Sequence, residues 1–283
     1  MSRIVIVTGA GRGIGRAHAL AFGASGARVV VNDVSADAAR EVASLIGSRA
    51  VVNTDDVGTW AGAERVVSAA VSAFGGLDVL VNNAGIVRDR MVVSCSEDEW
   101  DDVVRVHLKG HFALLHHAAV HWRGVVKAGG VVSGRVINTS SGAGLFGSVG
   151  QASYSAAKAG IASLTLVAAA ELSRYGVTVN AIAPSARTRM TEVAFASVMA
   201  APVDGFDAMA PENVSPLVVW LGSEEAGDVS GRMFEVDGGR VCVVHGWQRG
   251  PVVDKGARWL PEELGPVVRK LVAEDHPVPV YGA

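Results

Sequence analysis

Three side chains carry the chemistry that this sequence suggests first. Tyr154 and Lys158 lie four residues apart in a stretch with helical periodicity, Ser153–Gly160, which places both side chains on one helix face. A free tyrosine has a pKa of about 10, too high for a useful base at neutral pH, and a nearby ammonium lowers that pKa by favouring the phenolate. Tyr154 can then take a proton from an alcohol or return one to a ketone oxygen.

Ser141 provides the third group. It follows an apolar run, Arg135–Asn138, and its hydroxyl can hold a substrate oxygen at the point where negative charge develops. A Tyr-x-x-x-Lys pair alone is usually an amphipathic surface pair. The catalytic interpretation therefore depends on the features that precede the pair in the chain.

A glycine-rich loop, Thr8–Gly15, follows the first apolar run and opens a helical stretch. Glycines let the backbone approach a pyrophosphate closely, and the helix N-terminus offers it N–H groups and the positive end of a dipole. A glycine cluster also fits a simple tight turn, but this one has both the strand and the helix that a dinucleotide site requires. The loop residues expected to bind the cofactor are Gly9, Arg12, Gly13, Ile14 and Gly15.

Asp33 ends the second apolar run, where a carboxylate can accept hydrogen bonds from the adenosine ribose hydroxyls. The same carboxylate repels a 2′-phosphate, so NAD is favoured over NADP. Arg12 argues in the other direction, because a basic residue in this loop can meet a phosphate. The alternative role for Asp33 is that of a helix N-cap or turn residue.

Two further segments follow predicted strands. Asp56 and Val57 come after the third, and Asn83, Ala84 and Gly85 come after the fourth. Ligands bind at such carboxyl ends in open α/β sheets, and Asp56 is expected to hydrogen-bond the adenine amino group. The Asn-Asn-Ala-Gly segment fits a turn equally well, because Asn and Gly tolerate unusual dihedral angles. No Cys/His spacing suggests a metal site.

Short Val-rich runs alternate with Ala-rich helical stretches throughout the chain. This βαβα pattern predicts an α/β, Rossmann-type, doubly wound parallel sheet of about seven strands in three α/β/α layers. The predicted strands are Ile4–Val7, Arg28–Asn32, Ala50–Asn53, Val79–Val81, Arg135–Asn138, Thr178–Ala181 and Met233–Val236. The predicted helices include Gly15–Ser25, Ala63–Phe74, Glu97–His121 and Ser153–Tyr175.

Three segments break this alternation. We interpret Gly124–Gly134 as a surface insertion and Thr191–Glu212, rich in Ala, Met and Phe, as a mobile lid over an apolar substrate. Residues 1–245 are expected to form the Rossmann domain. Residues 246–283 then form an extension of the same domain with one short helix, near Glu262–Glu274.

Composition limits the classes of function. The chain has 283 residues, 49% of them hydrophobic, which suits one large folded domain. Its formal net charge of −3 includes no block of like charge, which argues against a nucleic-acid or membrane surface. No apolar run reaches membrane-spanning length and no signal peptide is recognised, so we expect a cytoplasmic protein. Cys95 and Cys242 are expected to be reduced.

Taken together, these motifs resemble those of the short-chain dehydrogenase/reductase (SDR) family, and the resemblance spans residues 4 to about 240. It implies a Rossmann-type fold, an NAD(P) cofactor, a Ser-Tyr-Lys catalytic set in which Lys158 also binds the nicotinamide ribose, and a homotetramer or homodimer. The matching pieces are Thr8–Gly15, Asn82–Gly85, Ser141, Tyr154-x-x-x-Lys158 and Asn180–Pro184.

Two positions depart from the family pattern. The family often has Asn in the helix after the fourth strand, where it supports a water relay behind the lysine, and His107 stands there in this chain. The imidazole can take over the relay, or it can simply bond a backbone carbonyl. The family also commonly has Pro-Gly after the sixth strand, where this chain has Pro184 followed by Ser185. Thr188 keeps a hydroxyl that can meet the cofactor carboxamide or a phosphate.

With these two departures, the sequence resembles the dehydrogenase module of peroxisomal multifunctional β-oxidation enzymes. This resemblance implies an NAD-dependent 3-hydroxyacyl-CoA or hydroxysteroid dehydrogenase. A second reading is a 3-oxoacyl-thioester reductase, against which Asp33 argues, since such reductases usually take NADPH. A third is a non-catalytic dinucleotide sensor, a class that tends to lose the tyrosine or the lysine. The segments that carry this resemblance are Ile86–Arg90, Val106–Gly110, Gly150–Lys158 and Ser185–Thr191.

Overall fold

A single sheet organises the molecule, as the computed structural model shows for residues 2–188, 201–202, 204–246, 248–275 and 280–281. Within these residues the sheet has eight strands in the order β3-β2-β1-β4-β5-β6-β7-β8, and all pairs except β7–β8 are parallel. The order reverses between β1 and β4, which creates a crevice at the carboxyl ends of the strands. The strands are β1 Ile4–Thr8, β2 Arg28–Asn32, β3 Ala50–Asn53, β4 Val79–Asn82, β5 Gly134–Thr139, β6 Val177–Ser185, β7 Met233–Asp237 and β8 Arg240–Val244.

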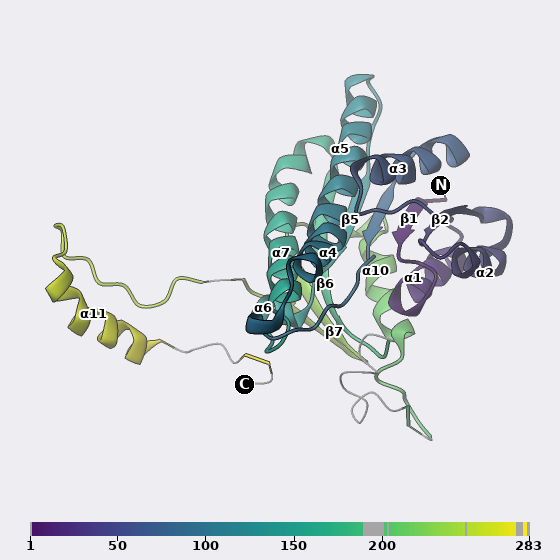
Figure 1. The fold of residues 1–283 in the computed structure, drawn as a ribbon. Coiled ribbons are helices and arrows are strands. Elements are labelled where there is room, and N and C mark those ends of the chain that lie inside the picture. The colour runs from purple at the N-terminus through teal and green to yellow at the C-terminus, as the bar shows by residue number, and fades with distance from the viewer. Residues whose placement is uncertain (1, 189–200, 203, 247, 276–279, 282–283) are drawn as a thin grey trace.

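Helices cover both faces of the sheet (Figure 1). One apolar core lies between the sheet and α3, α5 and α7, and the other lies between the sheet and α1, α2 and α10. Strands β1 and β4 are buried on both sides, which explains why their sequences, IVIVT and VLVN, are nearly continuous apolar runs. The helices are α1 Gly13–Ala24, α2 Ala36–Ile46, α3 Trp60–Phe74, α4 Glu97–Val104, α5 Gly110–Lys127, α6 Gly142–Phe146, α7 Ala152–Leu172, α10 Ser215–Leu221 and α11 Pro261–Glu274.

The structure confirms the predicted fold and corrects it in detail. The eighth strand was not predicted; it pairs antiparallel to β7 through a tight turn at Gly238 and Gly239. The stretch expected to be one helix from Glu97 to His121 is interrupted by a π-helical turn, Arg105–Lys109. The segment Gly124–Gly134 is not a separate insertion, because its first four residues continue α5.

We expected no segment long and apolar enough to span a membrane, and helix α7 is an exception. Together with the following turn it is long and apolar enough by length and composition alone. Its buried residues include Ile161, Thr165 and Leu172, and it packs against β6 and β5. A central helix of a large α/β core shows the same properties.

The C-terminal extension leaves the body of the molecule, and its helix α11 stands apart in Figure 1 with no buried residue. This helix agrees with the one predicted near Glu262–Glu274. The chain then returns, since Tyr281 exchanges backbone hydrogen bonds with Gly147 (3.2 Å) and Val149 (3.0 Å). Half of the predicted lid, residues 191–200 and 203, lies outside the described residues, so its role as a lid stays a prediction.

Candidate active site

A cavity of about 530 Å³ lies at the carboxyl ends of the central strands, where the strand order reverses. It is of the size that small-molecule and cofactor sites have. It brings together nearly all the residues that the sequence predicted for the site. Those in its wall are Gly9, Arg12, Gly13, Ile14, Gly15, Asp33, Asn83, Ala84, Gly85, His107, Ser141, Tyr154, Lys158, Pro184 and Thr188.

The glycine loop fits a dinucleotide phosphate on two counts. Gly9 has φ +60° and Gly13 has φ +52°, and a Cβ on Gly15 would lie 2.1 Å from the carbonyl oxygen of Gly9, so side chains are excluded. Helix α1 begins at Gly13, and its N-cap residue, Arg12, makes no side-chain capping hydrogen bond. The first N–H groups of α1 therefore face the cavity without a capping side chain, as an anion-binding helix N-terminus requires.

Thr8 and Asn83 hold this loop against the end of β4. The Thr8 hydroxyl accepts hydrogen bonds from the backbone N–H groups of Asn83 (3.0 Å) and Ala84 (3.1 Å). The Asn83 amide donates to the carbonyl of Thr8 at 2.9 Å. The Asn-Asn-Ala-Gly segment is thus more than a turn, because it fixes the spacing between the two strands that border the crevice.

Asp33 sits at the end of β2 with its carboxylate held by backbone donors. Oδ2 accepts from the N–H of Gly11 and Oδ1 from the N–H of Ser35, each at 2.9 Å. The carboxylate also lines the cavity. It is therefore fixed where the two hydroxyls of an adenosine ribose would be recognised.

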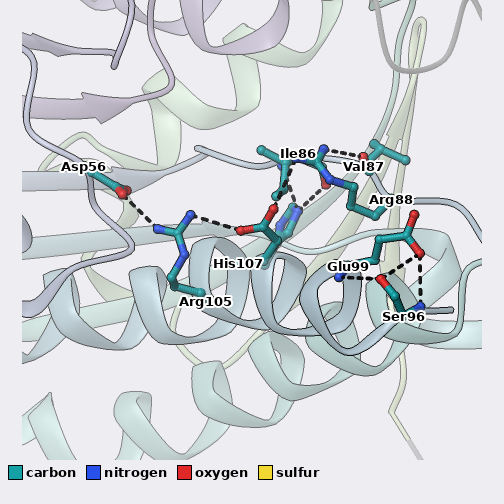
Figure 2. A network of polar contacts seen from close by, with 9 residues as sticks. Asp56, Ile86, Val87, Arg88, Ser96, Glu99, Arg105 and His107 are labelled. Carbon is teal, nitrogen blue, oxygen red and sulfur yellow. Dashed lines mark hydrogen bonds and ion pairs between the residues drawn. The ribbon is translucent and has the colours of Figure 1, made fainter.

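Asp56 and Val57 are the two predicted cofactor residues that the structure does not place in the cavity wall. The Asp56 carboxylate pairs with Arg105 at 2.8 Å (Figure 2). It also accepts from the N–H of Gly58 at 2.8 Å. Val57 is buried in the core. An ion pair between residues 49 positions apart leaves no signal in the sequence, which is why Asp56 looked available for adenine.

His107 occupies the π-helical turn, a local irregularity that often marks a functional site. Its Nε2 lies 2.7 Å from the carbonyl oxygen and 3.0 Å from the backbone nitrogen of Ile86, as Figure 2 shows. Burial and the charge of Lys158 lower the pKa of His107 to about 3, against the hydrogen bond to that carbonyl, which raises it, so the ring is neutral. The ring meets Tyr154 edge-on with centroids 5.2 Å apart.

Tyr154 and Lys158 share one face of α7, as predicted. The Lys158 ammonium donates to the carbonyl of Thr139 at 2.6 Å and lies 5.5 Å from the centroid of the Tyr154 ring. Burial lowers the pKa of Lys158 to about 7. The same burial raises the pKa of Tyr154, against a hydrogen bond from Ser141 that lowers it, while the charge of Asp89 adds to the rise.

The expected depression of the Tyr154 pKa by the ammonium is thus not what this structure shows. Desolvation is the largest cause of both shifts: Lys158 is buried and Tyr154 is half-buried in the cavity wall, and loss of water disfavours the charged form of each group. The phenol is therefore the resting form, suited to giving a proton. Additional positive charge near the phenol is needed before it becomes a strong base.

Ser141 is positioned by the helix that it caps. Its Oγ accepts from the N–H of Ala143 at 3.2 Å at the start of α6. With that lone pair engaged, the O–H can donate, and it reaches Tyr154. Ser141, Tyr154 and Lys158 therefore form a continuous polar set on the cavity wall.

Sequence reasoning missed several wall residues. Five of them lie in segments that carry the family resemblance, and the other two, Thr139 and Ser140, directly precede Ser141, so both signals were present in the sequence. These residues are Ile86, Val87, Arg88, Thr139, Ser140, Gln151 and Ala186.

Comparison with known proteins gives consistent relatives. The model of the short chain dehydrogenase family matches residues 3–198. A hydroxyacyl-CoA dehydrogenase of Mycobacterium tuberculosis is 44% identical over 293 residues, which cover 99% of this chain and 92% of that protein. The peroxisomal multifunctional enzyme type 2 of Mus musculus is 42% identical over 280 residues, covering 95% of this chain and 34% of that longer protein.

Among solved structures, the crystal structure of a short chain dehydrogenase from Mycobacterium avium has the same fold with a TM-score of 0.92. It is 62% identical, and the match covers 99% of this chain and 98% of that one. The likeness therefore includes the C-terminal extension as well as the sheet.

Proposed function

This chain belongs to the short-chain dehydrogenase family and is an NAD(P)-dependent oxidoreductase acting on CH–OH groups, and from that premise we propose that it oxidises 3-hydroxyacyl-CoA thioesters or hydroxysteroids with NAD. The observation that carries the proposal is the meeting of Ser141, Tyr154 and Lys158 with the glycine loop and Asp33 in one cavity. A non-catalytic sensor would have no need of the proton-transfer groups. The predicted self-association and location in the cell stay predictions.

The roles of the side chains follow from their positions. The nicotinamide that the glycine loop, Asp33 and Lys158 would hold would supply the acceptor for the hydride of the alcohol carbon. The Ser141 hydroxyl donates to the substrate oxygen and holds it beside the phenol. Tyr154 exchanges the alcohol proton. Lys158, which donates to the carbonyl of Thr139, places its charge beside the phenol, and its remaining N–H groups would hold the cofactor ribose.

The substrate class is supported by the relatives. The two relatives named above are a hydroxyacyl-CoA dehydrogenase and a peroxisomal multifunctional enzyme. We expect a panel of 3-hydroxyacyl-CoA esters, hydroxysteroids and simple secondary alcohols to show NADH formation, followed by absorbance, with the highest kcat/KM for a thioester or a steroid. Turnover of simple alcohols alone would contradict the proposal.

The cofactor choice is a separate prediction. The fixed Asp33 carboxylate repels a 2′-phosphate, so kcat/KM should favour NAD over NADP by at least about tenfold, or about 1.4 kcal/mol. Asp33→Ala should narrow this ratio. Asp37→Ala is the matched control, because the Asp37 side chain is 98% exposed and pairs with Arg40. A preference of the unaltered enzyme for NADP would overturn the prediction.

A reductase of 3-oxoacyl thioesters is the second candidate, and one observation favours it. Arg12 is exposed on the cavity wall, where its guanidinium can meet a 2′-phosphate of NADPH. The ratio of kcat/KM for NAD to that for NADP decides between the two candidates, because Asp33 favours NAD and Arg12 favours NADP.

A further inference from the structure

The segment Val280–Tyr281 belongs to the C-terminal extension and pairs with the stretch of chain that joins α6 to α7. The backbone carbonyl of Tyr281 accepts from the N–H of Val149 at 3.0 Å, and its N–H donates to the carbonyl of Gly147 at 3.2 Å. The two stretches also form a parallel β-bridge. The extension is therefore fixed at the connection between the two helices that carry the catalytic side chains.

The ring of Tyr281 covers one face of α6. It meets the ring of Phe146 edge to face, with centroids 5.7 Å apart. A Cβ on Gly142 would stand 2.7 Å from Cε2 and 2.9 Å from the phenol oxygen of Tyr281, so the ring fills the space that a glycine leaves open. Because Tyr281 is 47% exposed, it covers α6 from the solvent side and is not part of the buried core.

Helix α7 holds the opposite face of α6. A Cβ on Gly144 would stand 2.6 Å from the backbone carbonyl carbon of Lys158. Positions 142 and 144 are separated by about 200° around a helix, whereas positions 142 and 146 lie four residues apart and share a face. Helix α6 is thus held between the ring of Tyr281 and the backbone of α7.

This support is needed because α6 has only five residues, Gly142–Phe146. So short a helix is not stable through its own hydrogen bonds and depends on packing. Ser141 is its N-cap residue, and the Ser141 Oγ accepts from the N–H of Ala143 at 3.2 Å. Any shift of α6 would therefore move the Ser141 hydroxyl relative to Tyr154.

We propose that Tyr281 is a positioning residue for Ser141. Its ring holds α6 against α7 and so keeps the Ser141 hydroxyl where it holds the substrate oxygen. Tyr281 and Gly142 are not among the residues of the cavity wall, so Tyr281 acts through Ser141 and not by touching the substrate. The inference rests on the role of Ser141 in the proposed function, and it gives the C-terminal extension a part in catalysis.

The first test removes the ring. A misplacement of about 1 Å can cost about 100-fold in rate, so the looser α6 of Tyr281→Ala should lower kcat by about tenfold for the best substrate of the panel. The affinity for NAD should not change, because the glycine loop and Asp33 are untouched. Tyr281→Phe should restore kcat, since it keeps the ring. Val272→Ala is the control, because Val272 is 67% exposed on α11 of the same extension.

The same change in a Ser141→Ala background separates positioning from a general loss of structure. If Tyr281 acts through the Ser141 hydroxyl, Tyr281→Ala should cause no further loss of kcat once that hydroxyl is absent. An equal loss in both backgrounds, or wild-type kcat in Tyr281→Ala, would overturn this proposal alone. Full turnover in Ser141→Ala would overturn the role of Ser141 in the proposed function, and this proposal with it.

Gly142→Ala tests the contact from the other side and decides the matter even if Tyr281→Ala does not fold. The added Cβ displaces the ring, so this variant should also lose about tenfold in kcat, and the double variant with Tyr281→Ala should be no slower than either single one. Gly124→Ala is the matched control, because a Cβ there, on α5, would meet nothing within 4 Å. Wild-type kcat in Gly142→Ala, or losses that multiply in the double variant, would show that Tyr281 does not hold α6.

Discussion

Replacing Tyr154 with phenylalanine is expected to lower kcat for alcohol oxidation by about 100-fold or more. The substitution removes the phenol oxygen that exchanges the substrate proton and leaves the ring, which keeps its edge contact with His107. The affinity for NAD should change little, because the glycine loop and Asp33 are untouched. Steady-state kinetics over a range of pH, together with titration of NAD binding, measure both quantities.

Tyr175→Phe is the matched control for this change. Tyr175 lies in the turn after α7, where Arg174 stacks on its ring at 4.9 Å, and it is not part of the cavity wall. Its loss should leave kcat near that of the wild type. If Tyr154→Phe retained wild-type turnover, Tyr154 would have no place in the proton transfer, and Ser141 would have to be considered instead.

The parts of the site that the sequence predicted are those set by local rules. A glycine at position 15 is required because Gly9 lies 2.1 Å from where a Cβ would stand, and such close approaches recur wherever a strand turns into a phosphate-binding helix. Tyr154 and Lys158 meet because helical spacing alone puts them together. Asp33 reaches the cavity because it ends a strand beside β1.

The missing parts depend on contacts between distant segments. Helix periodicity cannot show which faces of α5 and α7 meet, because the two helices contact each other only in the folded protein. The π-helical turn that carries His107 resembles continuous helix in the sequence, because no glycine or proline lies within Arg105–Lys109 and the helix continues through Gly110. The partner of Asp56 was hidden for the same reason.

The environment of Lys158 gives the last prediction, in which activity and stability move in different directions. Lys158→Met should lower kcat/KM by about 1,000-fold, because it removes both the charge beside Tyr154 and a cofactor contact. An effect of this size is typical of the loss of an acid–base or positioning group. Methionine keeps the length of the stem, so packing on α7 is retained. The free energy of unfolding without cofactor should not fall.

The reason is that burial holds the pKa of Lys158 at about 7, below the value of 10.5 for an exposed lysine. In the folded state the ammonium is therefore penalised: the penalty is fully present below about pH 7 and disappears as pH rises through the unfolded pKa. The Met variant escapes it, so its Tm advantage over the wild type should be larger at about pH 6 than at about pH 9. Melting curves at both pH values measure this difference. A Met variant that does not fold, or a Tm advantage that grows with pH, would contradict this prediction. Lys158 would then stabilise the folded state through its hydrogen bond to Thr139, and its burial would not lower stability.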